Sequence, residues 1–212
     1  MGVKTEFFNG ALTSTLAFFH LTKSNILTAD LSTLDPTDQR VVGEQRSRGI
    51  ELDISGQLSE SISLIGSYAF TGTEVLEDPQ QFDDGTGNIV TTEGNAGHRF
   101  ANVPRHAGSL FAKYSFQEAS LRGLSLGAGV FAASQRQGDL ENSFQLPGYV
   151  RLDAFAAYEW KLGPPRITAQ LNIENLSDKE YFESSNIGEG IPRFSVFPGA
   201  PLTVLGSIRL EY

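Results

Sequence analysis

Apolar and polar residues alternate with a period of two along most of the chain. The clearest case is the final segment, Pro201–Tyr212, whose even-numbered positions carry an apolar face. Its odd-numbered positions form a second face that includes Arg209 and Glu211. Side chains alternate across a strand, whereas a helix repeats every 3.6 residues. The pattern therefore predicts a strand with one apolar and one polar face.

The same pattern predicts nine strands, separated by turn and loop signals. Asn9-Gly10 is a strong hairpin signal, and the Asp-, Gly- and Asn-rich stretch Leu76–Val103 predicts a long loop. The nine predicted strands cover Gly2–Phe8, Ala11–Leu27, Val41–Leu58, Ile62–Val75, Pro104–Phe116, Leu124–Ala132, Gly148–Trp160, Arg166–Leu176 and Pro201–Tyr212.

The lengths of the predicted connections distinguish between two all-β architectures. In a soluble sandwich the apolar face meets a core, whereas in an outer-membrane barrel it meets lipid. Short and long connections alternate along this chain, which is typical of a barrel with tight turns on one side of a membrane and loops on the other. Aromatic residues at the strand ends would form an interfacial girdle: Tyr114, Phe116, Tyr158, Trp160 and Tyr212. The pattern favours an antiparallel transmembrane β-barrel over a soluble sandwich.

Composition narrows the function classes. The 212 residues hold 40% hydrophobic side chains, a formal net charge of −9 and no cysteine. The negative charge argues against nucleic acid as a partner, because such proteins carry a basic footprint. The absence of cysteine excludes a disulfide framework or a thiolate metal site within these residues. No apolar run reaches the eighteen residues that a spanning helix needs.

The number of strands predicts an incomplete barrel. With nine antiparallel strands the first and last run parallel, so they cannot close the sheet as bacterial barrels do. The segment Met1–Asn9 also lacks the apolar region of a signal peptide. Both observations predict that residues 1–212 are the C-terminal part of a larger barrel.

Several segments, in order along the chain, resemble TonB-dependent siderophore receptors of the ferrichrome type. They are the run Gly43–Glu51, the run Asn102–His106, Leu146–Tyr149 with Asp153, Asn172–Leu176 with Asp178, Tyr181 and Phe182, and Pro198–Pro201 followed by Val204–Gly206. Each segment alone is a weak signal, and their order makes the match specific.

The resemblance implies an architecture and an activity. The family's barrel has 22 strands around an N-terminal plug, in the outer membrane, and imports ferric siderophores with energy passed through TonB. This chain would supply about the last nine strands, and the plug and signal peptide would be absent from it. The implied partners are outer-membrane lipid, a ferric siderophore and the TonB system, which acts through the missing plug. The chain alone would not be competent for transport.

A bulky and often anionic siderophore would suit aromatic residues paired with cations. We expect such residues in the long loops and the upper lumen, although packing of loop on loop is the simpler explanation for any one of the aromatics. The candidates for substrate binding are Phe82, Arg99, Phe100, Arg136, Phe144, Phe182, Arg193, Phe194 and Phe197.

Other chemistry-bearing residues have simpler interpretations. His20, His98 and His106 lack metal-ligand spacing. A group of acids could hold calcium but more simply forms a solvated loop: Glu74, Glu77, Asp78, Asp83 and Asp84. The charges predicted to face the lumen are expected to form cross-strand pairs or to pack on a plug: Glu51, Asp53, Arg151, Asp153, Glu159, Arg209 and Glu211. No catalytic constellation is present, so we expect neither an enzyme nor a bound cofactor or metal.

Two alternatives stay open at this point. A small or oligomeric outer-membrane barrel or pore would need an even strand count or closure between chains. A soluble β-sandwich binding module would need the apolar face of the last strand, Leu202–Tyr212, to be buried by protein. An outer-membrane protease is a weaker possibility, because no acid–histidine arrangement is evident.

Overall fold

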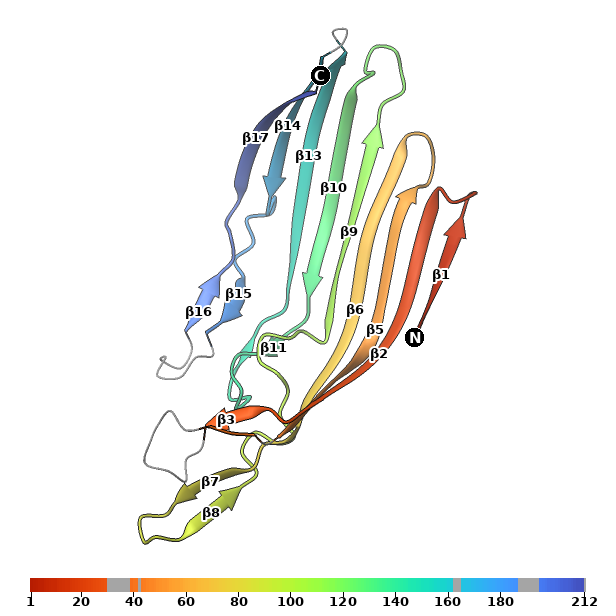
Figure 1. The fold of residues 1–212 in the computed structure, drawn as a ribbon. Helices are drawn as coiled ribbons and strands as arrows, with labels where there is room; N and C mark the ends of the chain where they lie inside the picture. The colour runs from red at the N-terminus through yellow and green to blue at the C-terminus, as the bar shows by residue number, and fades with distance from the viewer. Residues whose placement is uncertain (30–38, 42, 162–164, 187–194, 212) are drawn as a thin grey trace.

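The protein is an open, curved antiparallel sheet of nine strands (Figure 1), seen in a computed structural model. The structure describes residues 1–29, 39–41, 43–161, 165–186 and 195–211. Among these residues, no helix is long and apolar enough to cross a membrane. In spatial order the strands are β1 (Gly2–Phe7), β2 (Leu12–Ser24), β5 (Glu44–Gln57), β6 (Ile62–Glu77), β9 (His106–Ser115), β10 (Leu124–Ala133), β13 (Tyr149–Lys161), β14 (Arg166–Glu174) and β17 (Thr203–Glu211).

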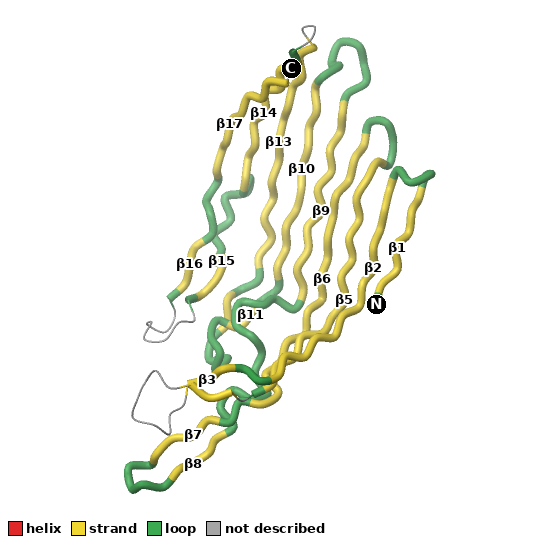
Figure 2. Tube along the Cα trace, viewed as in Figure 1, coloured by secondary structure: helices red, strands yellow, loops and turns green. Residues whose placement is uncertain are grey.

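The nine strands confirm the prediction from alternating residues, and the connections confirm the predicted alternation of short turns and long loops. The tight turns after β1, β5 and β9 lie at one end of the sheet, and the longer connections extend from the other (Figure 2). The predicted Asn9-Gly10 hairpin forms, with Phe8, Asn9 and Gly10 all at positive φ. Each strand pairs antiparallel with its predecessor in the sheet, as hairpin connections require.

The long connections contain short strands that the sequence did not predict. Four two-stranded sheets form there: β3 (Leu27–Ala29) with β4 (Gln39–Val41), β7 (Gln80–Asp83) with β8 (Ile89–Thr92), β11 (Arg136–Gln137) with β12 (Gln145–Leu146), and β15 (Phe182–Ser185) with β16 (Val196–Pro198). Strands of two to four residues are too short to show a period. The second strand was also predicted too long, because Asn25 turns the chain at positive φ directly after Ser24.

The two faces of the sheet differ as predicted. One face carries a row of apolar side chains, in which Leu110 pairs with Val130 and Val130 with Leu152. Leu110 is 47% exposed and Ile208 on the last strand is 77% exposed. A sandwich would bury this face under a second sheet. The exposed apolar face therefore contradicts the soluble-sandwich alternative.

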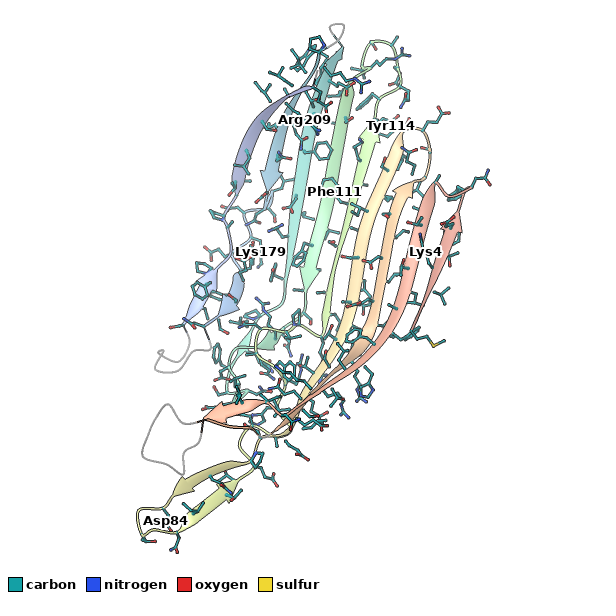
Figure 3. All side chains as sticks on the ribbon, in the orientation of Figure 1. Lys4, Asp84, Phe111, Tyr114, Lys179 and Arg209 are labelled. Atoms are coloured by element: carbon teal, nitrogen blue, oxygen red, sulfur yellow. The ribbon has the colours of Figure 1, made fainter. Side chains whose placement is uncertain are left out.

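Aromatic residues gather near the turn end of the apolar face, as a girdle requires. The Tyr114 and Phe116 rings meet edge to face with centroids 4.9 Å apart, and Tyr158 and Trp160 lie 4.8 Å apart. Figure 3 shows Tyr114 near this end of β9. Tyr212, the fifth predicted member, lies outside the described residues.

Candidate functional site

Aromatic rings and guanidinium groups meet on the polar face, where the central strands end at the long connections. We call Phe131, Tyr149, Arg151, Tyr181 and Arg136 the rim cluster. The Tyr149 and Tyr181 rings stack with centroids 4.2 Å apart. The guanidinium carbon of Arg136 lies 5.6 Å from the centre of the Tyr149 ring, and that of Arg151 lies 5.9 Å from the centre of Phe131. These distances fit cation–π contacts.

The sheet register brings the rim cluster together. Phe131 of β10 is the direct partner of Arg151 of β13, and Tyr149 pairs with Ala133 one step along the same face. Tyr181 comes from the connection between β14 and β17 and is buried. Gly199 makes room for it, because a Cβ there would lie 2.1 Å from the Tyr181 ring.

Arg151 is fixed by its neighbours. Its Nη2 lies 2.9 Å from Oδ2 of Asp153, and its Nη1 donates to the Tyr181 hydroxyl at 3.4 Å. The other oxygen of Asp153 accepts the backbone N–H of Asn175 at 2.9 Å. One carboxylate thus holds both a rim-cluster cation and the start of the next connection.

Asn175 continues this anchoring with a fully buried side chain. Its Nδ2 donates to the carbonyls of Lys179 at 3.0 Å and Ala200 at 2.9 Å, and its Oδ1 accepts the Lys179 N–H at 2.8 Å. Three hydrogen bonds from one amide join the two ends of the connection that carries Tyr181. The Tyr181 ring is therefore positioned by a closed loop.

Arg136 is almost completely buried, with 3% of its surface exposed. Its Nη2 donates to the backbone carbonyls of Phe182 and Glu183, the latter at 2.8 Å. Burial lowers the pKa of the Arg136 guanidinium from its ordinary value, because desolvation disfavours the charged form. Arginine keeps its charge at neutral pH even so, so Arg136 places a positive charge inside the connections.

The prediction of cross-strand charge pairs was wrong for two of the pairs that form. Arg151–Asp153 and Arg209–Glu211 each join residues two apart on one strand, at 2.9 and 2.7 Å. Residues i and i+2 share a face, so such a pair needs no neighbouring strand. One charge pair among the described residues does cross between strands: Arg46 and Glu74 lie 2.6 Å apart and directly opposite each other in the β5–β6 register.

The nine predicted binding residues divide into three groups. Arg193 and Phe194 lie outside the described residues, and Phe82 is described only by its backbone, which pairs with Val90. The remaining six belong to three connections, those between β6 and β9, β10 and β13, and β14 and β17. They are Arg99, Phe100, Arg136, Phe144, Phe182 and Phe197.

The structure brings some of these six together. Phe182 and Phe197 are both exposed on the small β15–β16 sheet, which Arg136 contacts through the Phe182 carbonyl. Phe144 instead packs against Gly138 within its own connection. Arg99 lies with Asn142, whose Oδ1 accepts the Arg99 N–H at 2.9 Å and whose Nδ2 donates back to the Arg99 carbonyl at 2.8 Å.

Two of the histidines and one of the acids that the sequence singled out have local partners. Nδ1 of His106 lies 2.8 Å from the Tyr68 hydroxyl, and Nδ1 of His98 lies 3.1 Å from the Leu140 carbonyl. Asp78 accepts from the backbone and side chain of Asn95 at 2.9 and 3.0 Å. Across the described ranges, no three His, Cys, Asp or Glu side chains are grouped as a metal site would need.

Four members of the rim cluster are not among the predicted binding residues: Phe131, Tyr149, Arg151 and Tyr181. Phe131, Tyr149 and Arg151 belong to strand ends and meet through the sheet register, whereas Tyr181 comes from the connection between β14 and β17. A signal was available in the resemblance segments. Tyr149, Asp153, Asn175 and Tyr181 all belong to them, and the structure places these distant segments in contact.

Comparison with known proteins gives the chain a family. The model of the family described as "TonB dependent receptor-like, beta-barrel" matches residues 1–176. The metal-pseudopaline receptor CntO of Pseudomonas aeruginosa is 40% identical over 212 residues, which is 100% of this chain and 27% of the receptor. The ferrichrome outer membrane transporter/phage receptor of Escherichia coli K12 is 34% identical over 185 residues, covering 87% of this chain and 23% of that protein.

Solved structures agree. The siderophore receptor PiuA of Acinetobacter baumannii superposes with a TM-score of 0.75 at 27% identity, over 99% of this chain and 28% of that one. The ferric preacinetobactin receptor BauA of the same species gives 0.75 at 30% identity, over 98% and 28%. The chain thus spans about a quarter of the length of each of these four relatives. It belongs to the TonB-dependent receptor family, whose β-barrels lie in the outer membrane, and forms part of such a barrel.

Proposed function

We propose that this chain is part of an outer-membrane receptor for TonB-dependent uptake of ferric siderophores. The observation that carries the proposal is the match of the whole chain, at 40% identity, to a metal-pseudopaline receptor. Relatives named for ferrichrome and ferrioxamine B support the same class of ligand. TonB would act through the plug of the complete receptor, as the family resemblance implies, and this barrel portion would not transport by itself.

The two faces of the sheet suit this role. The apolar row around Leu110 would meet lipid, and the polar face would line the barrel interior. The band between His106 and Tyr114 on β9 spans eight steps, or about 26 Å at roughly 3.3 Å per residue, close to the height of a barrel's apolar band. The long connections would then stand at the cell surface, where a siderophore arrives.

The rim cluster would form part of the ligand's path. Aromatic faces offer apolar contact area to a bulky chelate, and the partly exposed guanidinium group of Arg151 offers positive charge to an anionic one. The exposed rings of Phe182 and Phe197 extend this surface toward the outside. The other predicted loop residues, including Phe82, Arg193 and Phe194, are also proposed to contribute to ligand contact.

Uptake measurements test the proposal. In a strain without other siderophore receptors, deletion of the gene should abolish accumulation of radioactive iron from at least one of three chelates: the iron complex of pseudopaline, ferrichrome and ferric preacinetobactin. A restored gene with Tyr149→Ala should reach the outer membrane and take up less iron than the unsubstituted gene. Unchanged uptake of every chelate in the deletion strain would contradict the proposal.

A second candidate, an oligomeric pore, follows from the sheet itself. In the described structure β1 and β17 are the edge strands of the nine-stranded sheet, and an open edge offers backbone groups to a strand of another chain. An antibody against residues 203–211 separates the two candidates. An outer-membrane polypeptide several times longer than 212 residues supports the receptor, and one of this chain's own length in that fraction supports the pore.

A further inference from the structure

Three long connections meet at Asn102, which lies between β6 and β9 in the left-handed region at φ 60°. Its backbone N–H donates to the Gln137 carbonyl at 2.8 Å, and the preceding residue, Ala101, forms a parallel bridge with Gln137. These backbone contacts join the β6–β9 connection to the β10–β13 connection. Asparagine tolerates this backbone conformation better than most residues do, so the backbone at position 102 favours an asparagine there.

The Asn102 side chain reaches the third connection. Its Nδ2 donates to the Ser185 carbonyl at 2.9 Å, and its Oδ1 accepts the Ser185 N–H at 2.8 Å and the Ser185 hydroxyl at 3.0 Å. The same hydroxyl lies within hydrogen-bond distance of the Gly138 carbonyl. Ser185 is 5% exposed. One amide therefore pairs with the backbone of β15 on both its donor and its acceptor side.

Arg136 holds the other end of β15. Its Nη2 donates to the carbonyls of Phe182 and Glu183, whereas Asn102 holds Ser185. The strand β15 runs from Phe182 to Ser185, so the two side chains fix its first and last residues. Both fixing residues are inside the connections rather than in the nine-stranded sheet, whose ladder does not reach β15.

We propose that Asn102, Ser185 and Arg136 are positioning residues that lock the three connections into one unit and hold the β15–β16 pair in place. Phe182 and Phe197 belong to this pair, so the lock sets the position of an exposed aromatic surface next to the rim cluster. The importance of that surface for ligand binding rests on the proposed function, whereas the lock itself does not.

Hydrogen exchange on the complete receptor in detergent tests the lock. Asn102→Gly keeps the left-handed backbone and removes every side-chain bond, so amide exchange in residues 183–186 should rise about tenfold or more. Asn102→Asp keeps the acceptor oxygen and should restore part of the protection. The matched control is Asn9→Gly, which removes an asparagine at φ 56° from the tight turn at the opposite end. It should leave exchange in residues 183–186 unchanged.

The outcomes are decisive in each case. Equal protection in Asn102→Gly and the unsubstituted receptor would overturn the lock, and so would a rise of the same size in Asn9→Gly, which would indicate general loosening. If Asn102→Gly does not assemble, Asn102→Asp decides: protection no lower than that of the unsubstituted receptor overturns the proposal.

Ligand binding distinguishes the lock from the proposed function. In Asn102→Gly, the affinity for whichever of the three iron chelates the unsubstituted receptor binds should fall, and Asn102→Asp should recover part of it. If the unsubstituted receptor binds none of them, the proposed function fails while the exchange result stands. If affinity is unchanged although exchange rises, the lock exists but does not position the binding surface.

Discussion

The nine-stranded sheet and the locked connections are held together in different ways. In the sheet, β10 pairs with β13 from Leu124 to Ala133 through a continuous backbone ladder, which any sequence of suitable alternation can form. In the connections, side-chain-to-backbone hydrogen bonds from Asn102, Asn142 and Asn175 join segments that are far apart in the sequence or at the two ends of a loop. All three stand at positive φ between 54° and 60°.

The difference predicts how each region responds to substitution. In the sheet, a residue matters through the face on which it lies and the space it fills. In the connections, a residue matters through the backbone group that it alone satisfies, because an unpaired buried polar group is costly. Substitutions in the two regions should therefore differ in the size and the spread of their effects.

The largest effect is expected from a charge on the lipid face. Leu110→Arg should destabilise the barrel by about 2–4 kcal/mol, because it places a guanidinium against hydrocarbon near the middle of the membrane. Ser109→Arg, the adjacent residue on the interior face, should cost much less. The two variants are compared by heating samples to a series of temperatures and measuring, on a gel run without further heating, the fraction that still migrates as folded protein. Equal losses would contradict the assignment of faces.

Glycines beneath aromatic rings give the next effect. The Phe111 and Phe155 rings stack 5.7 Å apart over Gly127 and Gly129, and a Cβ on Gly129 would lie 2.2 Å from the Phe111 ring. Figure 3 shows Phe111 in the middle of the sheet. Gly129→Ala should cost about 1–3 kcal/mol through overpacking. At Gly206 a Cβ meets nothing within 4 Å, so Gly206→Ala should leave the same thermal unfolding curve almost unchanged.

A substitution in the connections should act locally. Asn142→Gly removes the reciprocal bonds to Arg99 while keeping the left-handed backbone, at a cost of about 1–2 kcal/mol. Hydrogen exchange should rise near residues 98–100 and stay constant in β9 and β10. A rise that extends through those strands would show that the two regions are not independent.

The smallest effect is a pH dependence at the tip of the β7–β8 pair, where Figure 3 places Asp84. Hydrogen bonds from the Thr86 hydroxyl and N–H lower the pKa of the Asp84 carboxyl. A lowered pKa means that this stabilisation is fully present above the ordinary value near 4 and is lost as pH falls through the lower, folded value. The Thr86 amide resonance should shift in that window, and Asp84→Asn should remove the transition.

The fold was largely predictable because a strand with one face against lipid needs strict alternation. That pattern located all nine sheet strands, including Pro201–Tyr212, whose described part forms β17. It could not locate β7 or β15, since four residues show no period. It also misjudged the pairing of Arg151, because a period of two does not say whether a charge pairs along its own strand or across to the next.

The candidate site was predictable only in part. Arg136, Phe182 and Phe197 were singled out as a cation with aromatics, and the structure places them around one small sheet. Tyr149 and Tyr181 are far apart in sequence, and only the sheet register and the turn anchored by Asn175 bring their rings together. Such contacts depend on the three-dimensional path of the connections, which local sequence patterns do not encode.

The central claim is that the sheet crosses the outer membrane with its long connections at the cell surface. The most direct test labels single cysteines on intact cells with a membrane-impermeant maleimide, in the complete receptor with any cysteine outside this chain replaced. This chain contains no cysteine of its own. Asn88→Cys, beside the tip of β7–β8, should react at once. Asn9→Cys, in a tight turn, should react only after the outer membrane is permeabilised. Reaction of Asn9→Cys and protection of Asn88→Cys on intact cells would contradict the account.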